Sequence, residues 1–120
     1  MSRIKTGVSL YSLQDQYLTK KMTLEDILHF VKECGAEGVE ILPDQMLKGA
    51  PDLTDEQVAN WHRMLKETGL QPVVSDVFLN TNLYKNRTLT HRECIDLLIK
   101  EIKQANRLGI KLIRLVSMVP

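Results

Sequence analysis

Two charged side chains stand out because the residues around them predict buried strands. Glu40 lies within the apolar run 38–42, and Arg114 lies within the apolar run 110–119. Side chains alternate along a strand, so each charge faces away from its aliphatic neighbours. A buried carboxylate and a buried guanidinium are retained when they are paired. We therefore expect Glu40 and Arg114 to meet on one face of a sheet, either as a structural ion pair or as groups directed at a substrate.

The elements that must position these charges are four short β-rich runs alternating with three amphipathic helices. Threonines begin the helices, with Thr54-x-x-Gln57 and Thr90-x-x-Glu93 as capping boxes and Thr23 ahead of an acidic first turn. A glycine follows each helix and precedes the next strand, as is typical of a helix C-terminus. We predict strands at 5–13, 38–42, 72–78 and 110–119, and helices at 23–34, 54–68 and 90–108.

Alternation of this kind predicts an α/β fold in which parallel strands pair in the order 1-2-3-4, with all three helices on one face. The other face of a parallel sheet also needs cover. Closure into a (β/α)8 TIM barrel would supply that cover, and such a barrel takes about 250 residues. The glycine-rich phosphate motifs of doubly wound folds do not occur. We interpret residues 1–120 as one domain, a partial barrel of about four parallel strands and three helices forming the N-terminal half. Ligand contacts are then expected at the carboxyl ends of the strands, in segments 12–22, 43–53 and 79–89.

The composition excludes several classes of protein. Sixteen Lys and Arg residues against fifteen Asp and Glu residues give a net charge of +1. The chain therefore has no broad positive electrostatic field that would attract nucleic acid or anionic lipid. No secretory signal pattern or long apolar segment occurs, so we expect no membrane partner and a cytoplasmic location. Cys34 and Cys94 have no C-x-x-C spacing and are expected to be free, buried thiols.

Three segments resemble a known family. They are GVSLYSL at 7–13, GAEGVEI at 35–41 and ANRLGIKLIRL at 105–115, and they are similar to the xylose-isomerase-like TIM barrels. This superfamily includes sugar-phosphate isomerases and epimerases, inosose dehydratases and endonuclease IV. The resemblance spans essentially the whole chain and describes barrel architecture more than any one activity.

The resemblance implies a divalent metal (Mn, Mg, Zn or Co) held by carboxylates and histidine. The usual ligands lie on strands five to eight, so the resemblance assigns no metal ligand to this segment. His29, His62 and His91 lie on predicted helices, outside a barrel. The endonuclease branch is disfavoured because strands three and four contain no histidine and the net charge is only +1.

Polar residues near the predicted strand ends are the candidates for contact with the sugar or polyol that the resemblance implies. Tyr11 is the first, because a phenol at the mouth of strand one can stack on a sugar or hydrogen-bond to it. Ser75 and Asp76 are adjacent on strand three, and which of them faces inward depends on where the pleat begins. Ser117 is the candidate on strand four.

The resemblance thus implies the N-terminal part of a metal-dependent isomerase or epimerase of a sugar, sugar phosphate or polyol, acting by proton transfer next to a carbonyl. The alternative is a non-catalytic half-barrel module that assembles with itself or with another chain. For residues 1–120 alone we expect no turnover, because the implied metal ligands lie elsewhere. We also expect self-association through the bare inner face and the unpaired strand edges.

Overall fold

The computed structural model describes residues 3–81 and 86–117. Its sheet has four strands in the order β1-β2-β3-β4, and each neighbouring pair is parallel. The predicted strand order is therefore confirmed. The strands are β1 (Gly7–Ser9), β2 (Gly38–Ile41), β3 (Gln71–Leu79) and β4 (Leu112–Ser117).

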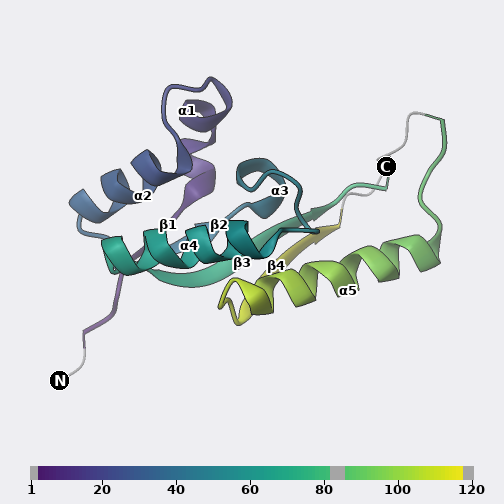
Figure 1. Cartoon of the computed structure of the whole chain (residues 1–120). Coiled ribbons are helices and arrows are strands. Elements are labelled where there is room, and N and C mark those ends of the chain that lie inside the picture. The colour runs from purple at the N-terminus through teal and green to yellow at the C-terminus, as the bar shows by residue number, and fades with distance from the viewer. Residues whose placement is uncertain (1–2, 82–85, 118–120) are drawn as a thin grey trace.

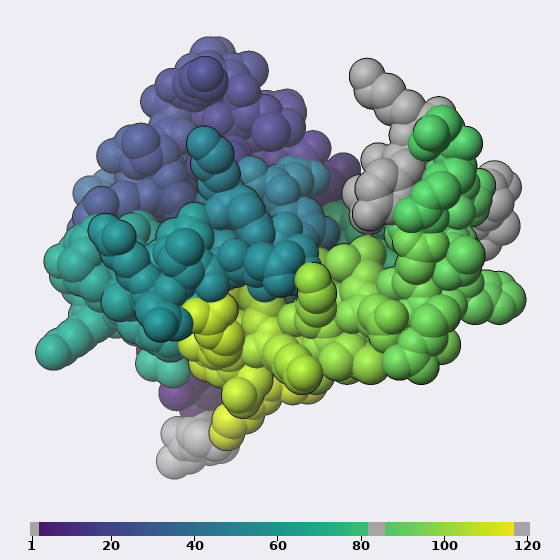
Figure 2. All heavy atoms as spheres, turned by 45° about the vertical axis from the view of Figure 1, so that its right-hand side comes forward, coloured from purple at the N-terminus to yellow at the C-terminus, as the bar shows by residue number. Residues whose placement is uncertain are grey.

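Three main helices lie over one face of this sheet (Figure 1). They are α2 (Leu24–Glu33), α4 (Asp55–Thr68) and α5 (His91–Arg107). The capping boxes predicted at Thr54 and Thr90 are confirmed. Thr23 begins α2 as predicted, and with Asp26 it forms a third capping box that the sequence analysis did not predict. Figure 2 shows the atoms of α5, in green and yellow-green, along one side of the molecule.

The core lies between the helices and the sheet. Trp61 of α4 is fully buried, and its indole N–H donates to the backbone carbonyl of Leu108 at 3.0 Å. Val39 and Ile41 of β2 are buried against the helices, while Glu40 between them points to the opposite face. Strand alternation thus separates an apolar face from a face that carries charge.

The segment after β1 differs from the expected strand. Only Gly7–Ser9 is extended, and a 3-10 helix (η1, Leu10–Leu13) and a short helix α1 (Gln14–Leu18) follow. The Ser9 side chain accepts a hydrogen bond from the Tyr11 backbone N–H at 3.4 Å, which caps the turn, and Leu10 is buried in the core. A local cap and one buried leucine therefore end the strand early.

Two further expectations concern Pro43 and the two cysteines. Pro43 was expected to stop strand two, and it does so as the first residue of a further short helix, α3 (Pro43–Met46), because a proline is well tolerated there. Cys34 is exposed because it is the C-terminal cap of α2, and Cys94 is half-buried, so the expectation of buried thiols was wrong, although both are free. Among the described residues, no helix is long and apolar enough to cross a membrane.

Candidate active site

A cavity of about 340 Å³ lies on the sheet face opposite the helices, toward the carboxyl ends of the strands. α/β proteins bind their ligands at this end of the sheet. All four strands or the turn after them contribute to its lining. The lining residues are Ser9, Tyr11, Glu40, Asp76, Phe78, Arg114 and Val116.

A larger cavity of about 560 Å³ lies nearer the amino ends of the strands. Glycines and valines line much of it. Of its charged groups, Glu37 already pairs with Arg3 at 2.6 Å. Ser9 and Glu40 line both cavities, whereas Tyr11, Asp76 and Arg114 line only the smaller one, so we take the smaller cavity as the candidate site.

The register of the strands brings the polar groups of the site together in pairs. Ser9 lies opposite Glu40, and the serine hydroxyl donates to the Glu40 carboxylate. Asp76 lies opposite Arg114, and the guanidinium Nη1 donates to Asp76 Oδ2 at 2.9 Å. Parallel neighbours in register place their side chains on the same face, so all four groups point away from the helices.

Asp76 is the most perturbed group in the cavity. Its side chain is 1% exposed, and its second oxygen, Oδ1, has no hydrogen-bond partner among the described residues. Burial raises the pKa of Asp76, the negative charge of Glu40 raises it further, and Arg114 opposes both effects. Asp76 can therefore hold a proton at a higher pH than an ordinary aspartate, which suits a group that gives and takes protons.

Arg114 is the accessible partner of this pair. Its side chain is 60% exposed while that of Asp76 is buried, so the guanidinium covers the carboxyl and faces the open cavity. A guanidinium has five N–H donors, and one is committed to Asp76. The others can bind an anionic or hydroxyl-rich ligand.

The expected Glu40–Arg114 pair takes a different form. Both side chains line the cavity, yet the ion pair of Arg114 described by the structure is with Asp76. The register explains the change, because Glu40 lies opposite Val74, whereas Arg114 lies opposite Asp76, two residues further along β3. Arg114 therefore pairs with its immediate strand neighbour.

The other predicted site residues do not all line the cavity. Tyr11 lines the cavity from η1 and is exposed at its mouth. Ser75 does not line the cavity: it is fully buried on the helix side of β3, so Asp76 takes the inward position of the two. Ser117 is the last residue of β4, but its side chain lies outside the described part of the chain.

Sequence reasoning did not select three lining residues. Ser9 is two residues before Tyr11, Phe78 is two residues after Asp76, and Val116 is two residues after Arg114. Strand alternation would place each of them on the face of its polar neighbour. This spacing was the signal that could have found them.

The described lining residues do not form a full metal site of the kind the family resemblance implies. They offer the carboxylates of Glu40 and Asp76 but no histidine, and Arg114 already binds one oxygen of Asp76. Metal sites of mixed carboxylate and imidazole ligands need three or more protein donors.

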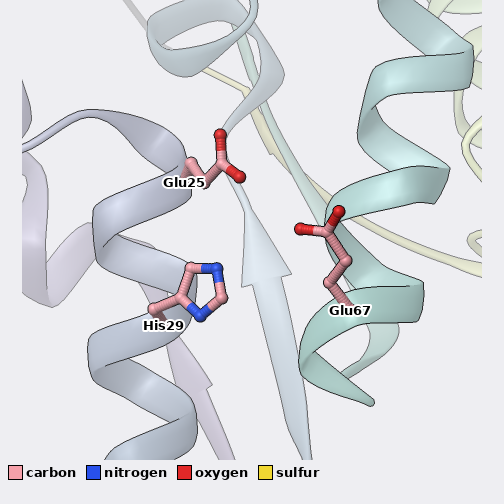
Figure 3. A group of neighbouring side chains, drawn as sticks. All are labelled: Glu25, His29 and Glu67. Carbon is pink, nitrogen blue, oxygen red and sulfur yellow. The ribbon is translucent and has the colours of Figure 1, made fainter.

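One group of potential metal ligands lies elsewhere, on the outer surface. Glu25 and His29 of α2 face Glu67 of α4, and their ligand atoms all lie within 4.8 Å of one another (Figure 3). Arg63 donates to both carboxylates, at 3.1 Å to Glu25 and 2.9 Å to Glu67. Its guanidinium holds the pKa of Glu25 below the ordinary value. A cationic side chain thus already pairs with both carboxylates of this group, and none of its residues lines the cavity.

Comparison with known proteins agrees with this geometry. The family described as "Xylose isomerase-like TIM barrel" matches residues 28–120. A C-glycoside deglycosidase alpha subunit from Arthrobacter globiformis is 32% identical over 109 residues, which cover 90% of this chain and 31% of the relative. A 3'-dehydrocarminate deglycosidase alpha subunit from Microbacterium sp. is 27% identical over 111 residues, covering 92% of this chain and 32% of the relative. The chain therefore spans about a third of the length of these relatives.

Two solved structures share the fold. The probable 3-DHS dehydratase AsbF from Bacillus anthracis superimposes with a TM-score of 0.66 at 18% identity, over 93% of this chain and 38% of that one. A xylose isomerase-like TIM barrel/4-hydroxyphenylpyruvate dioxygenase fusion protein gives a TM-score of 0.68 at 17% identity, over 98% of this chain and 17% of that one. The family match, the parallel sheet and its open inner face agree: the chain belongs to the xylose isomerase-like TIM barrel family and forms part of such a barrel.

Proposed function

We propose that this chain is the N-terminal part of a sugar-acting enzyme that transfers a proton next to a carbonyl of its substrate, as metal-dependent isomerases and epimerases do. The observation that carries the proposal is Asp76, a buried carboxyl that lines the cavity. Its pKa is raised, it has an arginine partner, and one of its oxygens has no hydrogen-bond partner among the described residues. The names of the relatives support a sugar substrate, and one of them names a dehydro compound, which contains a carbonyl.

Different residues of this chain can transfer the proton, orient the carboxyl group and contact the substrate. We assign proton transfer to Asp76 Oδ1, because the other oxygen accepts a hydrogen bond from Arg114. Oδ1 is itself buried, so this role requires the covering Arg114 side chain to move aside when substrate binds. Arg114 orients the carboxyl and offers its remaining N–H groups to substrate oxygens. Glu40 can accept from a sugar hydroxyl, and Tyr11 at the mouth offers a ring face and a phenolic hydroxyl.

A divalent metal remains part of the proposal for the whole enzyme. Such an ion supplies polarisation of the substrate carbonyl when it is bound. We place its ligands outside the described cavity residues, because these offer only two carboxylates.

The proposal is tested by binding, since turnover is not expected from this segment alone. Chemical-shift changes in amide NMR spectra of the full chain are followed during titration with D-fructose or an inosose. We expect shifts concentrated on Ser9, Tyr11, Asp76 and Arg114, with a dissociation constant in the millimolar range. Asp76→Asn should weaken binding by about fivefold or more, the cost of about one hydrogen bond.

Ser75→Ala is the matched control, because Ser75 is the adjacent residue on the other face and its buried hydroxyl has no partner among the described residues. It should bind the sugar as the unmodified chain does. Shifts confined to the helices, or equal binding by Asp76→Asn, would overturn the proposal.

A second function is favoured by the exposed apolar surface. Leu112 on the open face of β4 is 59% exposed, and Ile95, Ile99 and Ile102 form an exposed stripe along α5. Among the described strands β4 pairs on one side only, and such an edge can recruit another strand. We propose that the isolated chain assembles with itself or with another chain through these surfaces, as a half-barrel interaction module would.

Sedimentation velocity tests this assembly. The full chain should sediment as dimers or larger species at micromolar concentration, and Leu112→Lys with Ile99→Lys should shift the population toward monomer. His91→Gln is a control, since His91 is exposed on α5 outside the stripe. A chain that remains monomeric would contradict the proposal.

A further inference from the structure

α5 is the least covered of the three main helices, and it lies at the edge of the helix layer beyond α4 (Figure 1). None of its residues 91–100 is buried, whereas α2 and α4 each bury four residues. Ile95, Ile99 and Ile102 are 49%, 42% and 59% exposed. Their spacing puts them in one row along the helix, here called the isoleucine stripe. An exposed apolar row of this kind is a candidate surface for contact with another protein.

The isoleucine stripe points away from the described part of the chain. Lys100 pairs with Asp52 at 3.3 Å, and Arg107 pairs with Asp55 at 2.8 Å. These two cations therefore define the side of α5 that faces the start of α4. At about 3.6 residues per turn, the stripe lies about a third of a turn from that side and about a third of a turn from the buried row of the helix. The stripe is thus on the remaining, outward side of α5.

Charged residues border one edge of the stripe. Asp96 follows Ile95 and Lys103 follows Ile102, so the acid and the base lie on the same edge. The acid is nearer the start of α5 and the base is nearer its end. Asp96 pairs with Arg92 of the same helix at 3.1 Å, whereas Lys103 has no ion pair among the described residues.

Two such stripes complement each other when the helices run in opposite directions. With a twofold axis near Ile99, Ile95 of one copy lies near Ile102 of the other. Asp96 of each copy then lies near Lys103 of the other, so the symmetric interface contains this ion pair twice. Parallel helices would instead place Asp96 against Asp96 and Lys103 against Lys103, and like charges repel.

We propose that α5 binds α5 of a second copy of this chain, in antiparallel orientation, through the isoleucine stripe. The proposal rests on the self-assembly proposed above, for which it names the partner and the surface. It does not involve the candidate active site, because that cavity lies on the sheet face opposite the helices. Two stripes bury less than the ~1,200 Å² typical of stable interfaces, so we expect a dissociation constant on the order of 10 µM.

Reversal of charge tests the arrangement, with sedimentation velocity of the full chain at concentrations around the expected dissociation constant. Lys103→Glu places an acid opposite Asp96 in both ion pairs and should weaken the dimer about fivefold or more. Adding Asp96→Lys to that variant exchanges the two charges and should restore the dimer. Lys66→Glu is the matched control, because Lys66 is an exposed lysine of α4 and the net charge changes equally. It should dimerise as the unmodified chain does.

Ile99→Lys tests the apolar part of the surface. It should weaken the dimer about tenfold or more, because it places a charge at the centre of the interface. Circular dichroism should show an unchanged fold, since Ile99 is exposed in a single copy.

A dimer that persists in Ile99→Lys, or that does not respond to Lys103→Glu, would overturn this arrangement. Dissociation of that dimer by Leu112→Lys would show that the chain assembles through β4 instead. A chain that remains monomeric would overturn both the arrangement and the self-assembly, and would leave the stripe to a different polypeptide. Sugar binding in the cavity, measured separately, distinguishes these results from a failure of the proposed enzyme function.

Discussion

Adjacent polar residues on the two faces of the sheet have very different surroundings. Ser75 and Asp76 are adjacent on β3, and both are almost completely buried. Ser75 faces the helices, where packing encloses it. Asp76 faces the open side, where Arg114 covers it and Glu40 acts on it. Burial alone therefore does not distinguish these two residues; the face of the sheet and the charges on it do.

The charged partner distinguishes two buried carboxyl groups, Asp76 and Glu101. Burial is the largest cause of the raised pKa of both Asp76 and Glu101. Arg114 then favours the charged form of Asp76, whereas Asp44 favours the neutral form of Glu101. The charged partner therefore decides how far burial raises the pKa of each acid.

The largest expected effect compares the apolar residues of the two faces. Ile41→Ala on the covered face should lower the free energy of unfolding by about 2–5 kcal/mol, because it leaves a cavity in the core. Leu112→Ala on the open face should cost less than about 1 kcal/mol in the monomer, since that side chain is already largely in water. Urea denaturation at low protein concentration measures both. Equal losses would mean that the open face is covered in solution.

The next effect concerns pH. A carboxyl whose pKa is higher in the folded chain than in the unfolded chain stabilises the fold at low pH, and this stability is lost as pH rises toward the folded pKa. Glu101, with a pKa raised from 4.5 to about 8, should therefore make the chain less stable between pH 5 and pH 8, on the order of 2 kcal/mol.

Glu101→Gln should remove most of that slope in urea denaturation measured at several pH values. Asp96→Asn, a change in an exposed acid on the same helix, should keep it. A slope that is the same in Glu101→Gln and the unmodified chain would show that Glu101 is ionised at pH 7.

A smaller effect is expected for the ion pair of Asp76 and Arg114. Arg114→Gln should raise the pKa of Asp76 further, because it removes the charge that opposes burial. It should cost only about 1 kcal/mol of stability, since the guanidinium is largely exposed. Carboxyl carbon NMR follows the titration of Asp76. A pKa that falls in the variant would show that Arg114 does not stabilise the carboxylate.

Much of the fold could be predicted from the sequence because the local signals are strong. The threonine caps, the apolar stripes and the glycines after the helices fix where the main helices begin and end. Their alternation with β-rich runs fixes the strand order. The short helices after β1 and β2 depend on single contacts, such as the hydrogen bond from the Tyr11 N–H to Ser9, which periodicity does not show.

The pairing within the site was harder to predict. The register between β2 and β3 shifts by one residue between Val39 and Glu40, so Glu40 lies opposite Val74. Strand alternation assigns a residue to a face of the sheet, but it does not reveal a register shift. The partner of Arg114 depends on the register, so alternation alone could not identify it. Glu101 was missed for another reason: a glutamate on an amphipathic helix is normally exposed, but Glu101 is buried by the tertiary packing around α5, which periodicity does not show.

The most direct test of the account is the pKa of Asp76 in the unmodified chain, measured by carboxyl carbon NMR. We expect a pKa above the ordinary 3.8 of an aspartate, and a further change in that pKa when a ketose occupies the cavity. A value at or below 3.8 that is insensitive to the sugar would show that Arg114 dominates, and would contradict a role for Asp76 in proton transfer.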